Sequence, residues 1–239
     1  MSVLLLRLAG PMQAWGDSSR FTRRNTRKEP TKSGVIGLLA AAQGRSREDD
    51  IEDLVRLEYG VRVDQPGRII RDFQTERSED SKAVMPLSNR YYLSDAVFLV
   101  ALSASEEVLL SLDAALRSPR WPLYLGRRAC PASLPITLGV RQEYSNVRQA
   151  LSAEPWQADS WYRKRHSPLR LSVACDAQEG ESFESQSDLP LTFSIENRRY
   201  ASRLVHHFEV DNPSLPSVPE QVTGPGAFGE VDGFDPMSF

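Results

Sequence analysis

Residues 2–8 read SVLLLRL and run directly into AGPMQAWG at 9–16, and residues 30–42 read PTKSGVIGLLAAA. We predict that the first stretch is a β-strand, because it is a short apolar run that stops at Gly10 and Pro11, where proline has no amide to continue a ladder. It is too short to span a bilayer. The three stretches predict a strand, a glycine-bounded turn and a helix, and the fold prediction rests on them.

The helix is predicted to begin after Pro30, with Thr31 or Ser33 as its N-cap. Its apolar positions follow helical spacing, at Val35, Ile36, Leu38, Leu39 and Ala42. Four small residues let a backbone or a ligand approach closely: Gly34, Gly37, Ala40 and Ala41. Because the first amides of a helix are free, and cations precede this one, its N-terminus is also a place where phosphate could bind.

Residues 20–32 form a basic segment that joins the turn to the helix. It carries a local charge of +5, from Glu29 and six cations: Arg20, Arg23, Arg24, Arg27, Lys28 and Lys32. A charge run of this kind can simply be a solvated loop. Its place between a turn with Gln13 and Trp15 and a helix N-terminus favours an anion site.

The remaining pattern in residues 1–145 predicts an α+β domain. A helix is expected at 50–59, strands at 59–63 and 91–101, a helix at 105–116 capped by Ser105, and a strand at 135–140. The order is βαββαβ, the ferredoxin-like arrangement. Residues 66–90 interrupt it as a polar, charged excursion, which is either functional or a mobile surface loop. Its cations include Arg71, Arg77, Lys82 and Arg90.

A second candidate site lies at 122–131, which reads PLYLGRRACP. Gly126 frees the backbone to turn, and Arg127 and Arg128 have planar forks suited to phosphate or to a guanine edge. Tyr124 could stack on a base. The alternative is structural, with the arginines paired to carboxylates and Tyr124 in the core.

The C-terminal third is predicted to be a smaller, mostly β part at 146–210, followed by a tail at 211–239. The segment WYRKRH at 161–166 is a second basic cluster flanked by aromatic residues. His206 and His207 are adjacent, so on a strand they point to opposite faces and make a poor metal pair. The acidic tail carries no lysine or arginine and is expected to be disordered or an interaction segment.

Charge and cysteine usage limit the classes of function. The net charge is −3, yet residues 1–174 carry +6 and residues 175–239 carry −9, so only the first part suits nucleic acid. Cys130 and Cys175 lack CxxC spacing, so neither a disulfide framework nor a metal site is predicted. No cofactor is expected. The chain has no long apolar segment and no signal peptide pattern, which predicts a cytoplasmic protein without membrane contact.

Three motifs in order, LRLAGPMQAWG at 6–16, PTKSGVIGLLAAAQG at 30–44 and YLGRRACP at 124–131, resemble the CasD family of subunits of the type I-E CRISPR surveillance complex, Cascade, in the CRISPR-associated RAMP superfamily. The resemblance implies an RNA-recognition-type domain that grips the 5′ end of the CRISPR RNA. It also implies that residues 66–90 form a thumb-like hairpin that presses on the RNA and on the neighbouring backbone subunit.

Catalytic signatures are missing from the sequence: there is no Walker A loop, HExxH, GxSxG or dinucleotide fingerprint. A metal-independent endoribonuclease that processes precursor CRISPR RNA remains the alternative, since it needs only a general acid and base. A third hypothesis, a structural adaptor without RNA contact, leaves the basic segment unexplained.

We therefore predict a non-catalytic RNA-binding subunit that caps the 5′ handle of the CRISPR RNA. It would dock onto the backbone and large subunits and meet target DNA only through the complex. The six cations of residues 20–32 would hold phosphates. Gln13, Trp15, Ser33 and Gly34 would line a pocket for splayed handle bases.

Overall fold

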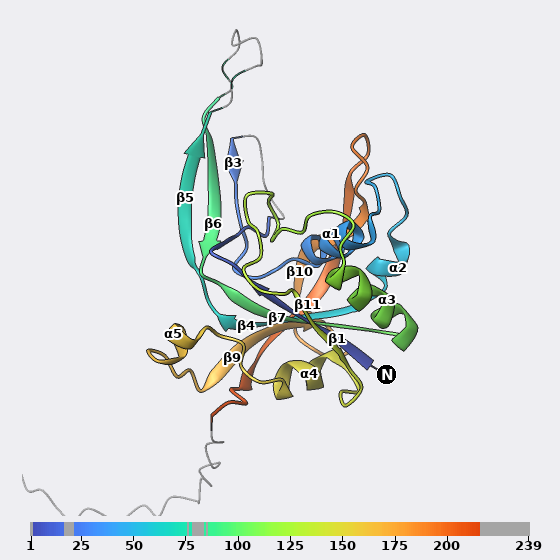
Figure 1. The fold of residues 1–239 in the computed structure, drawn as a ribbon, viewed down its shortest axis with the longest axis vertical. Helices are drawn as coiled ribbons and strands as arrows, with labels where there is room; N and C mark the ends of the chain where they lie inside the picture. The colour runs from blue at the N-terminus through green and yellow to red at the C-terminus, as the bar shows by residue number, and fades with distance from the viewer. Residues whose placement is uncertain (1, 17–21, 76, 78–83, 85, 216–239) are drawn as a thin grey trace, which may run out of the picture.

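The computed structural model describes residues 2–16, 22–75, 77, 84 and 86–215 (Figure 1). Its elements mix helices with antiparallel sheets, so the α+β class is confirmed. In chain order they are β1 (Ser2–Ala9), β2 (Met12–Gln13), β3 (Arg23–Arg24), α1 (Lys32–Gln43), α2 (Glu52–Val55), β4 (Glu58–Gln65), β5 (Arg68–Gln74), β6 (Ser88–Ser94), β7 (Val97–Ala104), α3 (Glu106–Arg117), β8 (Thr137–Arg141), α4 (Val147–Ala153), α5 (Ser160–Arg163), β9 (Arg170–Asp176), β10 (Glu184–Thr192) and β11 (Arg199–Asp211).

A seven-stranded sheet is the centre of the molecule, in the order β10-β11-β9-β4-β7-β1-β8, and each of its neighbouring pairs is antiparallel. Figure 1 shows α1, α2 and α3 on one side of it and α4 on the other. Strand β1 lies between these layers. Its Leu4, Leu6 and Leu8 join the core with α1 and α3, whereas Val3 and Leu5 join the core with α4. Burial on both faces explains why this strand is a continuous apolar run.

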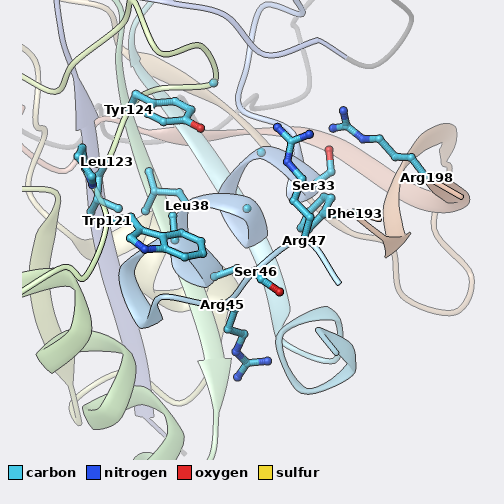
Figure 2. Close-up of a pocket in the computed structure, with 16 residues that line it drawn as sticks. Ser33, Leu38, Arg45, Ser46, Arg47, Trp121, Leu123, Tyr124, Phe193 and Arg198 are labelled. Carbon is cyan, nitrogen blue, oxygen red and sulfur yellow. The ribbon is translucent and has the colours of Figure 1, made fainter. Parts of the chain in front are cut away.

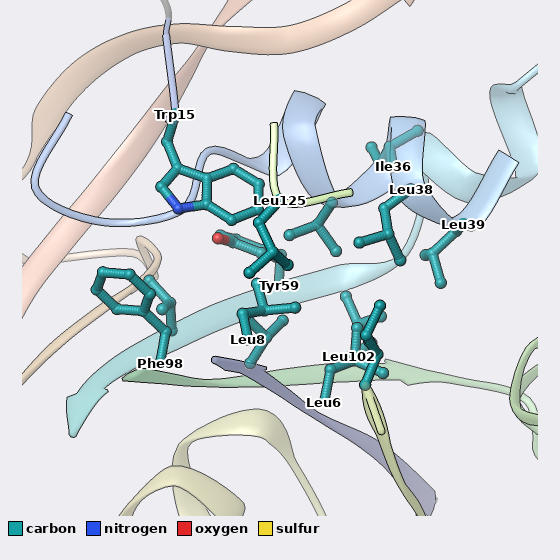
Figure 3. Packing of buried hydrophobic residues seen from close by; sticks show 14 of the residues in the cluster. Leu6, Leu8, Trp15, Ile36, Leu38, Leu39, Tyr59, Phe98, Leu102 and Leu125 are labelled. Atoms are coloured by element: carbon teal, nitrogen blue, oxygen red, sulfur yellow. The ribbon is translucent and has the colours of Figure 1, made fainter. Parts of the chain in front are cut away.

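Helix α1 packs on this sheet through the positions that its periodicity predicts. Val35, Ile36, Leu38, Leu39 and Ala42 are all buried, and Figure 3 shows Leu39 pointing from the helix toward the strands of the large sheet. The helix is capped by its own sequence: the Thr31 side chain accepts from the Gly34 amide (3.2 Å), and Gly44 closes the other end at φ 77°.

Two predicted elements differ from the structure. The strand expected at 91–101 is two strands in two sheets, because the chain turns at Asp95, a non-glycine residue at φ 54°, between β6 and β7. The helix expected at 50–59 is limited to the four residues of α2, because Tyr59 and its neighbours pair with β7 and β9 as part of β4. Tertiary pairing therefore overrides local helical spacing there.

The excursion at 66–90 contains β5 and the first three residues of β6, and the hairpin β5–β6, which continues to Ser94, rises out of the large sheet (Figure 1). Strand β5 is exposed along its whole length, and β6 also pairs with β2 and, in parallel, with β3. Arg71 lies opposite Tyr91 and Asp72 opposite Arg90 in the hairpin register, while Arg77 pairs with Val84 beyond it. Lys82 lies outside the described residues.

The C-terminal strands extend the same sheet, because β9 pairs with β4. No break in the sheet separates residues 146–210 from the first 145, and the three-part division of the chain stays a prediction. Most of the acidic tail, from residue 216 onward, lies outside the described residues. In the part of the chain that the structure covers, no helix is long and apolar enough to cross a membrane.

A buried network of charges joins the β10–β11 hairpin to the N-terminus of α1. Asp188, fully buried on β10, accepts from the Lys32 backbone amide (2.8 Å) and from Arg203 on β11 (3.0 and 2.8 Å). Asp176 on β9 binds Arg203 (2.8 Å) and the Lys32 ammonium (3.3 Å). Burial lowers the pKa of Lys32, and the Asp176 carboxylate opposes that effect. We name Lys32, Asp176, Asp188 and Arg203 the charge network.

We expect Asp188→Ala to lower the free energy of unfolding by about 3–5 kcal/mol, because the first amide of α1 stays buried without its acceptor and Arg203 keeps only Asp176 as a carboxylate partner in the charge network. Asp211→Ala is the matched control. Its side chain is 80% exposed and lies 3.5 Å from Arg170, so its loss should cost at most about 1 kcal/mol. Chemical denaturation measures both. Equal effects would show that the charge network does not hold the hairpin.

Candidate nucleic-acid interface

A groove crosses the exposed side of α1 (Figure 2). Its first cavity has a volume of about 200 Å³, and its floor is the set of small residues Gly34, Gly37, Ala40 and Ala41. A second, more polar cavity of about 340 Å³ continues it and shares Ser33, Gly126 and Arg198. We name the two cavities together the α1 groove. Because its floor has almost no side chains, a ligand could come close to the helix backbone.

The walls of the α1 groove are aromatic. Trp121 and Tyr124 stand on one side in Figure 2, and Phe193 lies across the helix on the other. Tyr200 from β11 lines the second cavity. Trp121 is 42% exposed and Tyr200 37%, so these rings offer surface to a ligand. Aromatic side chains in this position suit the faces of unstacked bases.

The arginines that line the α1 groove differ in whether they already have a partner within the protein. Arg45 forms an ion pair with Asp53 (2.5 Å). Arg198 lies over the ring of Tyr200 (5.3 Å). Among the described residues, no carboxylate comes within ion-pair distance of Arg24, Arg47 or Arg198, and all three are exposed. These three arginines are therefore available to an anion.

Arg127 joins the second cavity as a structural clamp. Its guanidinium donates to the carbonyls of Tyr91 (3.2 Å) and Arg24 (2.9 Å) and lies 4.6 Å from the centre of the Tyr92 ring. It thereby ties the 121–131 segment to β3 and β6. Its neighbour Arg128 is exposed, and Tyr124 is half-buried at the groove wall. Arg127 is therefore held in a structural role by backbone carbonyls and a ring, not by the carboxylates that the structural alternative named, and RNA contact by Arg128 stays a prediction.

The turn at Gly126 needs glycine for two separate reasons. Its φ is 86°, a left-handed conformation, and a Cβ there would lie 1.8 Å from the Ala14 carbonyl oxygen. The same contact is reinforced by the Ala14 amide, which donates to the Leu125 carbonyl (3.1 Å). One wall of the α1 groove is thus fastened directly to the chain segment that follows β1.

Gln13 and Trp15 lie beneath the α1 groove, where they cannot line it. Gln13 is fully buried and donates to the carbonyls of Leu8 (3.1 Å) and Ala96 (2.7 Å), and it accepts from the Trp15 indole (3.0 Å). Trp15 is 1% exposed, and its ring would lie 2.8 Å from a Cβ on Gly34. Their burial corrects the expectation of direct base contact: Trp15 supports α1 from the core, and Gln13 holds the Trp15 indole in place.

The N-terminus of α1 is already occupied by an anion of the chain itself. Asp188 accepts from the Lys32 amide, and the Thr31 side chain accepts from Gly34. Lys32 is 5% exposed and belongs to the charge network, so its side chain is not a free phosphate ligand. Ser33 is buried beside Thr31 yet lines both cavities. The expected phosphate site at this helix end is corrected accordingly.

The other cations of the basic segment are distributed along the approach to the α1 groove. Arg23 and Arg24 form β3 and are exposed, with Arg23 lying 5.3 Å from the centre of the Tyr91 ring. Lys28 is exposed as well. Arg27 pairs with Glu184 (3.2 Å) and Glu29 (3.9 Å), so it is already neutralised in part. Arg20 lies outside the described residues.

Residues that the sequence did not single out complete the groove. Arg47, Trp121, Phe193, Arg198 and Tyr200 all line it. The only signal in the sequence was the gathering of aromatic residues and arginines at 193–200, which reads FSIENRRY. Nothing in that stretch says that it lies against α1, because the contact depends on the charge network.

The described residues hold no cluster of histidine, cysteine and carboxylate side chains that could bind a metal ion. His166 stacks on Tyr162 (4.1 Å), and His206 and His207 lie on β11 near Ser182 and Glu184. None of the three histidines lines either cavity of the α1 groove. The groove can bind and orient an anionic, aromatic ligand, and its described lining offers no histidine for acid–base chemistry.

The fold and the groove define an α+β protein with a projecting hairpin and a cationic, aromatic-walled surface. Known families confirm and narrow that class. The family model described as "CRISPR-associated protein (Cas_Cas5)" matches residues 3–206, so the chain belongs to this family of CRISPR-associated proteins.

Three relatives show how close the likeness is. The "CRISPR system Cascade subunit CasD" of Escherichia coli (strain K12) is 37% identical over 179 residues, which are 66% of this chain and 80% of that protein. A solved structure titled "Crystal structure of Cas protein" has 38% identity and a TM-score of 0.71, covering 91% of this chain and 99% of that one. A chain of a "CRISPR RNA-guided surveillance complex" has 33% identity and a TM-score of 0.73, covering 89% and 91%.

We expect Gly126→Ala to destabilise the protein by more than the roughly 1–3 kcal/mol of backbone strain alone, because the new Cβ would also collide with the Ala14 carbonyl. Gly180→Ala is the matched control. Gly180 has nearly the same φ, 85°, with no atom within 4 Å of its Cβ position, so only the strain remains. Thermal and denaturant unfolding of the two variants give the difference. If the two variants are equally stable, the contact with Ala14 does not matter.

Proposed function

We propose that this chain is a non-catalytic subunit of a type I-E CRISPR RNA-guided surveillance complex, in which it caps the 5′ handle of the CRISPR RNA. One observation carries the proposal: the α1 groove combines three exposed arginines that have no carboxylate partner among the described residues with aromatic walls and a floor of small residues. Family membership and the likeness to CasD support it.

Handle bases would enter the first cavity of the α1 groove. Trp121, Tyr124 and Phe193 are the rings on which they would stack, and the missing side chain of Gly37 and the small methyl group of Ala41 leave room for a base against the helix. Stacking of this kind requires an unpaired strand, because paired bases hide their faces. The groove therefore fits the single-stranded end of an RNA rather than a duplex.

The phosphates of the handle would follow the arginines. Arg24 and Arg198 line the second cavity, Arg47 the first, and Arg128 stands exposed beside the wall. Arg23 and Lys28 extend the positive charge along the basic segment. A cationic path next to stacking rings is the usual way in which proteins hold single strands.

The ferredoxin-like arrangement is part of the proposal. Four strands of the large sheet, in the order β4-β7-β1-β8, alternate with α1 and α3 along the chain as βαββαβ, and this supports it. The β5–β6 hairpin would be the thumb. Its Arg71 and Arg77 are exposed, as are the apolar Ile69 (55%) and Phe73 (64%), a mixture suited to RNA and to a neighbouring subunit at once.

The partners would be the CRISPR RNA and the backbone and large subunits, with target DNA met only through the assembled complex in the cytoplasm. The endoribonuclease alternative is not favoured. CasD is a Cascade subunit by name, and the three histidines lie away from the α1 groove. The RNA recovered after each binding measurement below also tests it: without metal, the RNA should be intact on a denaturing gel.

We expect Arg198→Ala and Trp121→Ala each to weaken binding of handle RNA. For Trp121→Ala, which removes a stacking ring, the loss of binding free energy should be about 1–3 kcal/mol. Arg198→Ala should also lower the slope of log affinity against log salt by about 0.7, the value for one phosphate on a single strand. Fluorescence anisotropy across a salt series measures both. Arg117→Ala, on α3 away from the groove lining and 58% exposed, is the control.

A handle affinity that neither groove variant changes would overturn the assignment of the α1 groove. Cleavage of the RNA at a defined position, abolished by His166→Ala, His206→Ala or His207→Ala, would instead favour the endoribonuclease.

The neighbouring arginines Arg127 and Arg128 should separate structure from binding. We expect Arg127→Ala to lower the melting temperature, because three backbone carbonyls and the Tyr92 ring lose their cation. Arg128→Ala should leave the melting temperature unchanged and weaken handle binding by about 1–3 kcal/mol. Arg128→Lys should rescue a simple phosphate contact and fail to rescue a bidentate one. These roles would be contradicted if Arg128→Ala lowered the melting temperature while Arg127→Ala weakened handle binding and left the melting temperature unchanged.

A further inference from the structure

The basic, aromatic segment at 161–166 is not part of the α1 groove. It comprises the end of α5 and the residues that follow, and none of them lines either cavity. Figure 1 shows α5 beside β9 on the side of the large sheet opposite α1. The stretch from Ser160 to Arg170 contains four cations and no Asp or Glu. It is therefore a separate positive surface.

The four cations of this stretch are not equivalent. Arg163 donates to the carbonyls of Ala158 (2.6 Å) and Trp156 (2.5 Å), so it serves the fold. Arg170 lies near Glu209 (3.8 Å) and Asp211 (3.5 Å), which neutralise it. Lys164 and Arg165 are exposed, and no carboxylate in the described part of the chain is within ion-pair distance of either. Two adjacent cations thus remain available.

Three and four residues before these two cations, at a spacing that places side chains on one face of a helical turn, the chain carries an exposed aromatic ring. Trp161 is 46% exposed, and Tyr162 meets it edge-on, with ring centres 5.7 Å apart at 88°, rather than covering it by stacking. Tyr162 itself stacks on His166 (4.1 Å, 15°) and contacts Trp156 edge-on (6.2 Å). These ring contacts hold Trp161 in place on the helical turn that leads to Lys164 and Arg165.

The segment is also fastened to the core of the sheet. Arg62 and Asp64 on β4 form a fully buried ion pair (2.6 Å). Asp64 accepts from the Gln157 amide (2.6 Å), and its backbone carbonyl accepts from the Trp156 indole (2.7 Å). The loop that leads into α5 is therefore rigidly placed. A surface that is ordered in advance loses little entropy on binding.

We propose that Trp161, Lys164 and Arg165 form a second surface of this protein, which binds a single-stranded nucleic acid away from the α1 groove. An unpaired base stacks on Trp161, and the flanking phosphates meet Lys164 and Arg165. An exposed tryptophan together with two cations that have no carboxylate partner among the described residues favours a single strand over an acidic protein surface, because a polyacidic partner would bind the cations without using the ring.

The test uses the full chain and a short fluorescein-labelled oligothymidylate, with anisotropy measured across a salt series. We expect the double variant Lys164→Gln, Arg165→Gln to lower the salt slope by about 1.4, which corresponds to two phosphates on a single strand. Trp161→Ala should weaken binding by about fivefold or more. The charge-matched control is Arg56→Gln, Arg117→Gln, whose side chains are 76% and 58% exposed and which should leave the slope unchanged.

The same variants are then combined with Arg198→Glu, which weakens nucleic-acid binding by the α1 groove and leaves the second surface intact. Binding of the oligonucleotide by the two surfaces is thereby measured separately, without handle RNA. The proposal requires that Trp161→Ala lowers affinity and that Lys164→Gln, Arg165→Gln lowers the salt slope, both in the wild-type protein and in the Arg198→Glu variant. It is overturned if those effects vanish when the groove is weakened, or if affinity and slope are unchanged in the first place. It is also overturned if polyglutamate displaces the oligonucleotide while Trp161→Ala has no effect, since that result identifies an acidic protein surface.

Discussion

The charge network of Lys32, Asp176, Asp188 and Arg203 is the constraint on which the binding surface depends. It places two carboxylates and two cations in a buried site where α1, β9, β10 and β11 meet. Removing one member leaves an uncompensated buried charge, so the four residues keep or lose their arrangement together. Because Asp188 binds the first amide of α1, the charge network holds the β10–β11 hairpin against that helix, and this hairpin forms one wall of the α1 groove.

The same contact explains how the N-terminus of α1 is used. A helix N-terminus preceded by cations could attract a phosphate, yet here the fold supplies its own carboxylate. The anion-binding arginines stand instead at the rim, at Arg24, Arg47 and Arg198, on segments far apart in the chain. Trp15 and Gln13 stabilise the helix from below. The site is therefore a surface assembled around α1, and the helix end serves to hold its parts together.

Two faces of the large sheet carry different positive surfaces. The α1 groove is walled by rings, floored by small residues and bounded by Arg127, which clamps its loops. The second surface, formed by Trp161, Lys164 and Arg165, lines neither cavity of the α1 groove. The loop that leads to it is held by the buried Arg62–Asp64 ion pair. In each case a buried ionic contact, expensive to form in a low dielectric, orients loops whose exposed cations stay free. A net charge of −3 conceals both surfaces.

The sequence by itself determined the local elements and the family. The short apolar run of residues 2–8 and its stop at Gly10 and Pro11 were enough for β1, and the spacing from Val35 to Ala42 was enough for the buried face of α1, because such patterns depend on near neighbours. The break at Asp95, the burial of Gln13 and Lys32, and the clamp of Arg127 could not be predicted, since each depends on partners distant in the chain. The tertiary structure alone brought Arg198 and Phe193 to α1. A groove is a property of packing, and no local pattern records which distant strand will form its wall.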